Sequence, residues 1–247
     1  MIREKYTKEK EKFKTYKEVF DEPTMRTIHK LTNEGHIEYV MGPISTGKEA
    51  NVFLAKNSDD EFIAVKIFRT ETSSFENMLK YIKGDRRFEN IKPRKKDIVF
   101  TWCKKEFKNL EKAYNAGVDA PRPIISRDNI LLLEFIGEGE IPAPTAKKNP
   151  PKDPKKWLTK ILNMIKALYQ KESLIHGDLS EYNILNFAEK PILIDIGQGV
   201  LKDHPAALEL LKKDIENILN WFKRLGLKDI PEANKVYKEI TGKKEDG

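Results

Sequence analysis

The chain has few residues that could form covalent or metal crosslinks. Cys103 is the only cysteine among 247 residues, which excludes an intrachain disulfide and a metal site built from cysteines. Glutamine is also scarce, with only Gln170 and Gln198. Together with a charged fraction of 34%, this resembles the Lys- and Glu-rich composition of thermophilic proteins.

Long apolar segments are absent as well. No apolar run approaches the roughly 18 residues that a membrane-spanning helix needs. The first residues are highly charged and lack the apolar core of a signal peptide. We therefore expect a cytoplasmic protein that has no membrane partner.

The composition is otherwise typical of one large soluble domain or two small ones. Hydrophobic residues make up 39% of the chain, which suffices for a substantial core. The net charge is +7 and the isoelectric point is about 9.1. A nucleic acid or ribonucleoprotein partner fits this charge, and a solvated basic surface fits it equally well.

Periodicity of the apolar residues separates helices from strands. A helical period predicts helices over residues 7–20, 22–34, 71–82, 101–116, 155–172, 205–225 and 231–241. Alternation between turn residues predicts strands over residues 37–41, 51–56, 61–68, 122–126 and 130–136. Residues 83–97 show no period and many charges, and they predict a mobile loop.

A proline-rich segment divides the chain. Residues 137–154 contain five prolines and two glycines, which is typical of a linker. The predicted organisation is a helical extension, a strand-rich N-terminal lobe, a hinge, a helical C-terminal lobe and a charged tail (1–35, 36–136, 137–154, 155–241 and 242–247).

Two polar clusters in the second half indicate magnesium chemistry. Asp178 and Asn183 lie in a polar loop between apolar pairs, and Asp195 follows the apolar run Ile192–Ile194. Short buried strands beside these loops would bring the three side chains together. Two oxygen ligands and one spare carboxylate are what Mg²⁺-dependent phosphoryl transfer needs.

The segment 42–52 nearly matches the phosphate-binding pattern G-x-x-x-x-G-K-[ST], but Glu49 replaces the metal-binding hydroxyl. The residues that follow alternate as in a strand, whereas that motif opens a helix. We interpret the segment as a small-residue turn over a nucleotide, with backbone N–H groups, Ser45 and Thr46 at the phosphates. A plain hairpin turn is the alternative.

Lys66 lies within a strand, where a buried cation needs an anionic partner. It shares a strand face with Ala64, and a small residue beside a cation suits an adenine ring and its phosphates. The alternative is a lysine at a strand end that reaches water.

The helix at 101–116 can supply the partner. Glu106 lies nearer than Glu111 to the centre of its apolar stripe (Cys103, Phe107, Leu110 and Tyr114), although it can also be an ordinary surface residue. We further expect free backbone groups at Glu134 and Ile136, at a strand end where an adenine can pair.

Taken together, these parts resemble a protein kinase in order and spacing. His176-Gly177-Asp178 stands in place of H-R-D, and Asp195-Ile196-Gly197 in place of D-F-G. The segment Ser45–Ala50 replaces the usual glycine-rich loop. With these departures the chain is similar to the RIO family of atypical kinases over roughly residues 25–235. It is most similar to the Rio-one subfamily, and we expect an archaeal member.

The resemblance implies an α+β, two-lobed protein-kinase-like fold, with an antiparallel-sheet N-lobe and a reduced, mostly helical C-lobe. It implies ATP and Mg²⁺ or Mn²⁺ as cofactors. It assigns catalytic roles to Asp178, Asp195 and Lys66, and metal binding to Asn183 and Asp195. Asp195 is also a candidate phospho-acceptor. Nucleotide binding is assigned to Ser45, Thr46, Lys48, Val52, Ala64, Lys66, Glu106, Glu134, Ile136 and Leu185.

The same resemblance implies an autophosphorylating serine/threonine kinase or ATPase that acts on few peptides, because no A-P-E element follows Asp195. Its implied partner is a small ribosomal subunit precursor, through protein and rRNA surfaces, and not DNA. Two basic segments fit this partner. Residues 80–112 hold twelve Lys and Arg against five Asp and Glu, and residues 147–160 hold six Lys against one Asp.

Two other functions remain open from the sequence. An aminoglycoside-type phosphotransferase also uses an H-G-D loop, but the loop Ser45–Glu49 and the segment Asp195–Gln198 argue against it. A pseudokinase scaffold is the alternative without catalysis. The presence of Lys66, Asp178, Asn183 and Asp195 argues against that alternative.

Overall fold

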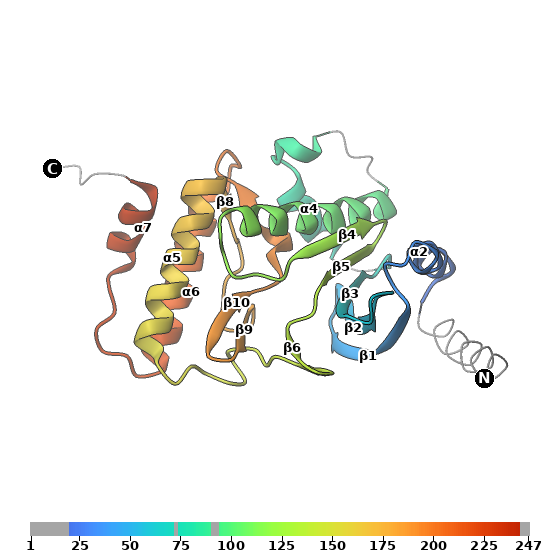
Figure 1. Ribbon diagram of the computed structural model, residues 1–247. Coiled ribbons are helices and arrows are strands. Elements are labelled where there is room, and N and C mark those ends of the chain that lie inside the picture. Colours follow the sequence, from blue (N-terminus) through green and yellow to red (C-terminus); the bar gives the residue numbers. More distant parts are fainter. Residues whose placement is uncertain (1–19, 72–73, 90–93, 243–247) are drawn as a thin grey trace.

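The structure is a computed structural model that describes residues 20–71, 74–89 and 94–242. The helix predicted over residues 7–20 lies almost wholly outside these ranges. Figure 1 shows the predicted α+β class, with a five-stranded sheet on one side and α5, α6 and α7 on the other. Helix α4 extends between the two parts.

The five-stranded sheet is antiparallel throughout, in the order β1-β2-β3-β5-β4. Its strands are β1 (Tyr39–Thr46), β2 (Ala50–Lys56), β3 (Phe62–Phe68), β4 (Pro123–Arg127) and β5 (Ile130–Glu134). The strands predicted over 51–56 and 61–68 are present, and they pair antiparallel across the turn at residues 57–60. Strand β1 extends past the predicted end at residue 41 as far as Thr46, with two register shifts on the way.

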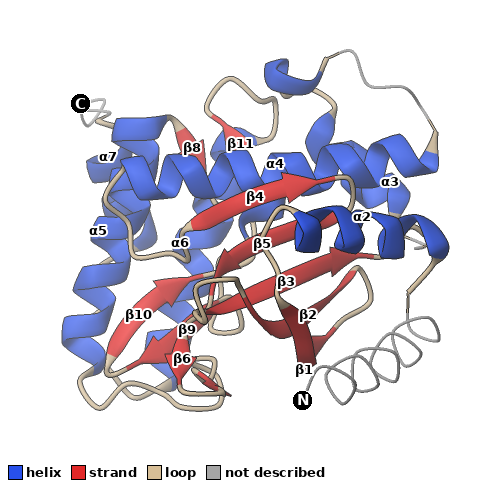
Figure 2. Ribbon diagram, turned by 45° about the vertical axis from the view of Figure 1, so that its right-hand side comes forward, coloured by secondary structure: helices blue, strands red, loops and turns tan. Residues whose placement is uncertain are grey.

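The central strand β3 is buried on both faces. Ile63, Val65 and Ile67 pack in one cluster with the apolar side of α2 (Glu22–Asn33). Ala64 and Phe68 point the other way, into the core that α4 shares with the C-terminal helices. Figure 2 shows α2 crossing the face of β3 and β5. A lysine on the α4 side of β3 therefore enters a buried layer between the lobes.

Part of the segment predicted to be a loop over residues 83–97 is helical. The chain forms α3 (Phe75–Ile82), a 3₁₀ turn η1 (Arg86–Phe88) and α4 (Lys95–Asn115), which begins six residues before the prediction. Asp85 is buried and its carboxylate accepts the Arg87 backbone N–H at 3.1 Å, which caps η1. Residues 90–93 lie outside the described ranges.

The second half holds the remaining elements. The predicted linker contains a small hairpin of β6 (Gly137–Glu138) and β7 (Ile141–Pro142). The C-terminal lobe is formed by α5 (Pro154–Glu172), β8 (Leu174–Ile175), β9 (Ile184–Phe187), β10 (Lys190–Leu193), η2 (Ile196–Gln198), β11 (Val200–Leu201), α6 (Ala207–Arg224) and α7 (Ala233–Thr241). None of the helices in the described ranges is long and apolar enough to cross a membrane.

One residue of an expected apolar stripe, Tyr114, and a second large apolar residue, Leu208, are on the surface. Tyr114 is 62% exposed and Leu208 is 40% exposed. In α4 the buried face includes the polar residues Lys105, Glu106 and Asn109, and these turn the helix away from the orientation that its apolar residues alone predict. In α6 the buried Asp214 has the same effect on Leu208.

Candidate active site

Lys66 lies between two carboxylates at the junction of the lobes. Its Nζ donates to both Glu106 carboxylate oxygens at 2.7 Å and to Asp195 Oδ1 at 2.9 Å. Burial opposes the charge on Lys66, but the charges of Asp195 and Glu106 outweigh it and raise the lysine pKa above its ordinary value. The lysine therefore stays protonated and carries three ionic hydrogen bonds.

Glu106 is at the centre of the buried face of α4, nearer to that centre than its apolar stripe predicts. Its residue surface is 1% exposed, and it faces β3 across the interior. A buried carboxylate is costly without a cation, and Lys66 supplies that cation from the neighbouring strand. The predicted ion pair is present, and the interpretation of Glu106 as a surface residue is wrong.

Asp195 follows β10 with a left-handed backbone, at φ 59° and ψ 53°. This region is costly for any residue with a Cβ atom, and such strain persists only where neighbouring contacts hold it. The Lys66 charge lowers the pKa of Asp195 below its ordinary value, so the carboxylate is ionised. Its side chain is 57% exposed, so one face remains open to a ligand.

Asp178 and Asn183 are joined within the polar loop between β8 and β9. Asn183 Nδ2 donates to the Asp178 carbonyl oxygen at 2.8 Å and to its carboxylate Oδ2 at 3.3 Å. Gln198 Nε2 donates to the same Oδ2 at 3.3 Å. Burial raises the pKa of Asp178 above its ordinary value, and the Asp195 charge adds to this. That direction improves a general base.

The residues present fit a magnesium ion. Asn183 uses its amide nitrogen on Asp178, and within the described ranges no donor reaches its Oδ1, which is left as a ligand. Asp195 adds an ionised, half-exposed carboxylate. No group of three or more His, Cys, Asp or Glu side chains gathers around a metal position in the described part of the chain. A magnesium ion here would complete its shell with water and phosphate oxygens, as is usual for Mg²⁺.

Asp214 holds the loop that carries Asp178, and the sequence interpretation missed it. Its two oxygens accept the backbone N–H groups of Gly177 and Leu179, both at 2.8 Å. Burial raises its pKa to about 7, although both N–H groups favour the ionised form. Its position was a signal, because Asp214 lies between Leu211 and Ile218 on the apolar face of α6, where a carboxylate needs buried donors.

Local backbone geometry explains the glycine of the H-G-D motif. Gly177 has φ +84°, and a Cβ atom there would lie 2.9 Å from the carbonyl oxygen of Gln198. An arginine at this position would therefore displace the segment that follows Asp195.

His176, the residue before Gly177, is buried, and burial lowers the pKa of its imidazole to about 4. The neutral ring donates from Nε2 to the Ile194 carbonyl oxygen at 3.1 Å, which ties this loop to the strand before Asp195.

The predicted nucleotide-binding residues divide into two groups. Strand pairing places Ser45 opposite Val52 and Val52 opposite Lys66, so these three share one face of the sheet. Ala64 is on that face too, opposite Leu54 on one side and Leu133 on the other. The second group lies away from these paired positions. Thr46 and Lys48 are exposed at the turn between β1 and β2, and Leu185 is in β9 of the other lobe.

The expectation of free backbone groups at the end of β5 is only partly met. The Glu134 N–H donates to the Arg122 carbonyl oxygen at 2.9 Å, and the Ile136 carbonyl oxygen accepts from Ala143 at 2.9 Å. Both are therefore engaged, because β4 and the segment after β7 fold back on this strand end. The Ile136 N–H has no backbone acceptor within the described ranges.

The chain is similar to several known proteins. A family model described as the RIO domain matches residues 51–236. The RIO-type serine/threonine-protein kinase Rio1 of Haloferax volcanii is 41% identical over 97% of this chain and 82% of its own. That of Methanocaldococcus jannaschii is 40% identical over 99% and 83%. Human serine/threonine-protein kinase RIO3 is 35% identical, and the match spans 95% of this chain but 48% of the human protein.

Among solved structures, the Rio2 kinase–ADP/Mg²⁺–phosphoaspartate complex from Chaetomium thermophilum superposes with a TM-score of 0.66. The match covers 88% of this chain and 66% of that one, at 22% identity. This likeness confirms the predicted two-lobed kinase fold.

Proposed function

The chain belongs to the RIO family of protein kinases, and we therefore propose that it is an ATP- and Mg²⁺-dependent serine/threonine protein kinase. The observation that carries the proposal is Lys66, held between Glu106 and Asp195, with Asp178 and Asn183 at the adjoining loop. Phosphoryl transfer needs positioning and charge stabilisation more than covalent chemistry. A fixed cation, an ionised carboxylate and a second carboxylate meet these needs.

Each side chain has a separate task in this proposal. Lys66 binds phosphate oxygens of ATP, and Glu106 holds the lysine in place. Asp178 orients the attacking hydroxyl and accepts its proton. Asn183 and Asp195 hold Mg²⁺, which when bound offsets charge on the phosphate oxygens. Val52, Ala64 and Leu185 line the adenine site, with Ser45, Thr46 and Lys48 at the phosphates and the strand end at Glu134 and Ile136 beside the base.

Incubation with ATP labelled at the γ-phosphate tests the proposal directly. We expect Mg²⁺-dependent labelling of the protein or release of labelled phosphate, abolished by EDTA. Replacing Asp178 with Asn keeps the shape but removes the base, so the rate should fall about 100-fold. Glu181→Gln is a control on the same loop, because Glu181 pairs with Arg224 and Lys147 outside the site. A wild-type protein that neither labels nor hydrolyses ATP would contradict the proposal and favour a scaffold.

The same assay separates the finer parts of the proposal, which include autophosphorylation and ATP hydrolysis. Label on serine or threonine is stable to hydroxylamine, whereas an acyl phosphate on Asp195 is cleaved by it. We include Asp195 as a phospho-acceptor because the Chaetomium Rio2 complex contains a phosphoaspartate. Labelling of an aminoglycoside instead of protein would indicate the small-molecule phosphotransferase.

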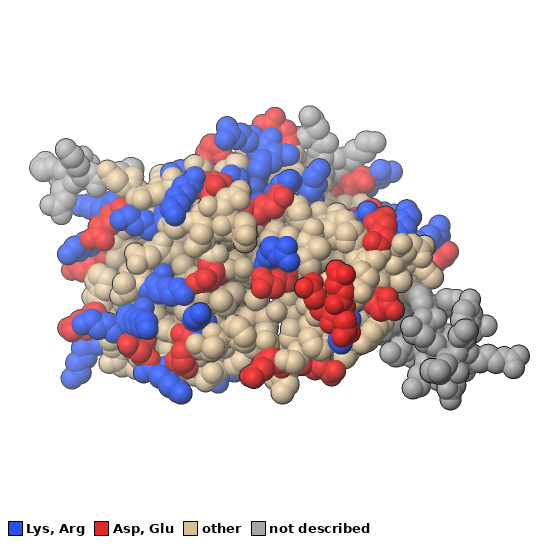
Figure 3. Space-filling model, in the orientation of Figure 1, with Lys and Arg blue, Asp and Glu red and all other residues tan. Residues whose placement is uncertain are grey.

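We propose a small ribosomal subunit precursor as the partner, with the basic segments as the contact. Figure 3 shows Lys and Arg side chains at the top of the molecule, over the region of α3, η1 and the start of α4. The surface is less basic than the count over 80–112 suggests, because Lys105 is fully buried and Arg87 is paired with Asp85.

Cosedimentation with small-subunit precursors tests this partner. Contacts to phosphates release counterions, so the affinity should fall at least about tenfold between 50 and 200 mM salt. The fraction of protein that sediments with the particles should fall accordingly. Bovine serum albumin measured in parallel gives the background. An affinity that does not change with ionic strength would contradict an rRNA contact through these segments.

A further inference from the structure

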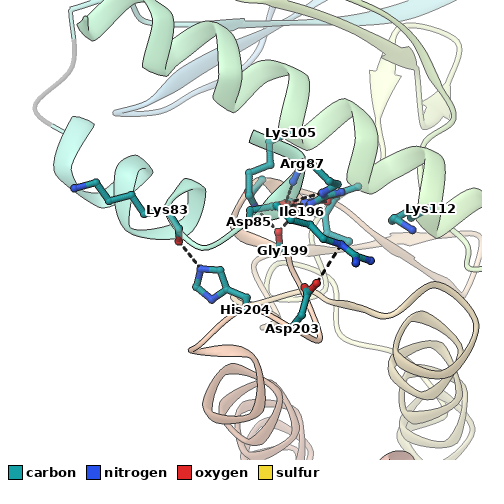
Figure 4. Close-up of polar contacts among 12 residues, drawn as sticks. Lys83, Asp85, Arg87, Lys105, Lys112, Ile196, Gly199, Asp203 and His204 are labelled. Atoms are coloured by element: carbon teal, nitrogen blue, oxygen red, sulfur yellow. Dashed lines mark hydrogen bonds and ion pairs between the residues drawn. The ribbon is translucent and has the colours of Figure 1, made fainter. Parts of the chain in front are cut away.

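A buried polar network lies behind the segment that follows Asp195, and none of the tasks assigned above uses it. Figure 4 shows side chains of η1 and α4 converging on the carbonyl groups of Ile196 and Gly199. These carbonyls belong to η2 and the residue after it, the turn that begins directly at the candidate metal ligand. The network therefore contacts the backbone of the segment that directly follows the candidate metal ligand Asp195.

Asn109 of α4 contacts that turn directly. Its Nδ2 donates to the Ile196 carbonyl oxygen at 2.8 Å and to the Gly199 carbonyl oxygen at 2.9 Å. Its residue surface is 0% exposed. Gly199 leaves room for this approach, because a Cβ atom there would lie 2.9 Å from Asn109 Nδ2. One amide group thus binds both ends of the turn.

Arg87 determines which way the Asn109 amide faces. Its Nη2 donates to Asn109 Oδ1 at 2.8 Å. A rotated amide would place its NH₂ group against the guanidinium and its oxygen against two carbonyl oxygens, so three unfavourable contacts would replace three hydrogen bonds. The arginine therefore acts on the metal loop through Asn109 and does not touch the loop itself.

Asp85 holds the guanidinium in turn. Its carboxylate accepts from Arg87 Nε at 2.9 Å and from Nη2 at 2.7 Å. The Arg87 charge and hydrogen bonds outweigh the burial of Asp85 and lower the pKa of that carboxyl. Within the described residues Arg87 Nη1 has no partner although it is buried. In this position the guanidinium donates hydrogen bonds to Asp85 and Asn109 through Nε and Nη2, while Nη1 is left without a partner.

A second α4 side chain supports the same turn. Lys105 Nζ donates to the Gly197 carbonyl oxygen at 3.1 Å and also to the Gly199 carbonyl oxygen. Every carbonyl from Ile196 to Gly199 except that of Gln198 therefore meets a donor from α4. The left-handed backbone of Asp195 needs neighbouring contacts to persist, and these donors fix the residues immediately after it.

We propose that Arg87 and Asn109 are positioning residues for the metal site, acting in series: Arg87 orients the Asn109 amide, which holds the Ile196–Gly199 turn so that Asp195 presents its carboxylate to Mg²⁺. This inference rests on the proposed function, because it assigns the network to the metal step of that reaction. It also connects η1 to the active site through Asn109.

Calorimetric titration of ADP with and without Mg²⁺ tests the proposal without relying on turnover. In Arg87→Lys the cation remains beside Asp85, but an ammonium lacks the planar fork that serves two partners. We expect the affinity for ADP in the presence of Mg²⁺ to fall about tenfold, while the affinity for ADP in EDTA is unchanged. Asn109→Ala should show the same loss, and Arg87→Lys/Asn109→Ala no more than Asn109→Ala alone.

The neighbouring Arg86 supplies a matched control. It is in the same 3₁₀ turn and pairs with the half-exposed Asp203 at 3.1 Å, away from Asn109. Arg86→Lys should leave both titrations unchanged. If Arg87→Lys fails to fold, Asp85→Asn/Arg87→Leu removes the buried charges together and should show the same selective loss.

Three results would overturn the inference. One is an unchanged Mg²⁺-dependent affinity in Arg87→Lys when the wild type binds ADP with Mg²⁺, which leaves the proposed function standing. Another is additive losses in the double variant, which would show that Arg87 and Asn109 act separately. A wild-type protein whose ADP affinity does not respond to Mg²⁺ would overturn the proposed function and this inference together.

Discussion

Replacing Lys66 with methionine is expected to lower both stability and activity more than any surface substitution. Methionine has a similar length but leaves Glu106 buried without a cation, which costs about 3–5 kcal/mol of unfolding free energy. Loss of the phosphate cation should slow ATP turnover by about 100- to 1,000-fold. Urea unfolding followed by circular dichroism measures the first effect, and the labelled-ATP assay the second.

The pH dependence identifies the cause of the stability loss. Without Lys66, burial raises the pKa of Glu106 further above its value in the unfolded chain. The folded state then binds a proton that the unfolded state lacks, so the Lys66→Met variant should lose stability as pH rises above 4.5, the ordinary pKa of a glutamate.

A double variant sharpens the same test. Lys66→Met/Glu106→Gln removes the buried charge and should recover about 2 kcal/mol of stability without recovering activity. Lys56→Met is the matched control, since Lys56 on the neighbouring strand pairs with the exposed Asp60 and should change little. A double variant as unstable as Lys66→Met would show that Glu106 is not the cause.

Replacing Asp214 with alanine is expected to disorder the loop that carries Asp178. Two charge-assisted hydrogen bonds to backbone N–H groups are lost in a buried site, at a cost of about 3–5 kcal/mol. A shift of the Asp178 carboxylate by about 1 Å is enough to reduce turnover roughly 100-fold. Thermal unfolding and the labelled-ATP assay measure the two consequences.

Two further variants test the assignment to Asp214. Asp214→Asn keeps one side-chain oxygen to accept from the two backbone N–H groups of Gly177 and Leu179. Its melting temperature and its rate should lie between those of the wild type and of Asp214→Ala. Glu216→Ala removes an exposed carboxylate from the same helix and should leave stability and rate nearly unchanged. An active Asp214→Ala protein would show that the loop keeps its shape through Asn217, which donates to the Leu179 carbonyl oxygen at 3.2 Å.

Periodicity predicted most elements because apolar residues dominate their buried faces. Helices α2 and α5 begin and end within one residue of their expected limits, and strands β2 and β3 within one residue of theirs. The pattern failed where polar residues are buried. Glu106, Asn109 and Lys105 count as surface residues in any hydrophobic pattern, so the pattern placed Tyr114 inside and Glu106 at the edge.

The candidate site shows the same division. Lys66, Asp178, Asn183 and Asp195 could be predicted, because Lys66 interrupts an apolar strand and the other three stand in polar clusters beside apolar runs. Asp85 and Arg87 were not predicted, since they lie in a charged stretch without a period and the role of Arg87 depends on its contact with Asn109, 22 residues further along the chain. Long-range contacts of this kind leave no trace in local spacing.

The two-residue ladder of β8 and β11 has a consequence for entropy. Ile175 pairs with Val200 and Leu174 with Leu201, so the chain from 175 to 200 forms a loop closed at its base. Closing a loop of this length costs roughly 3 kcal/mol, and that cost is met when the protein folds. Asp178, Asn183 and Asp195 all lie on this one loop. Arrival of a nucleotide therefore needs no further search along the chain to bring these three residues onto one loop.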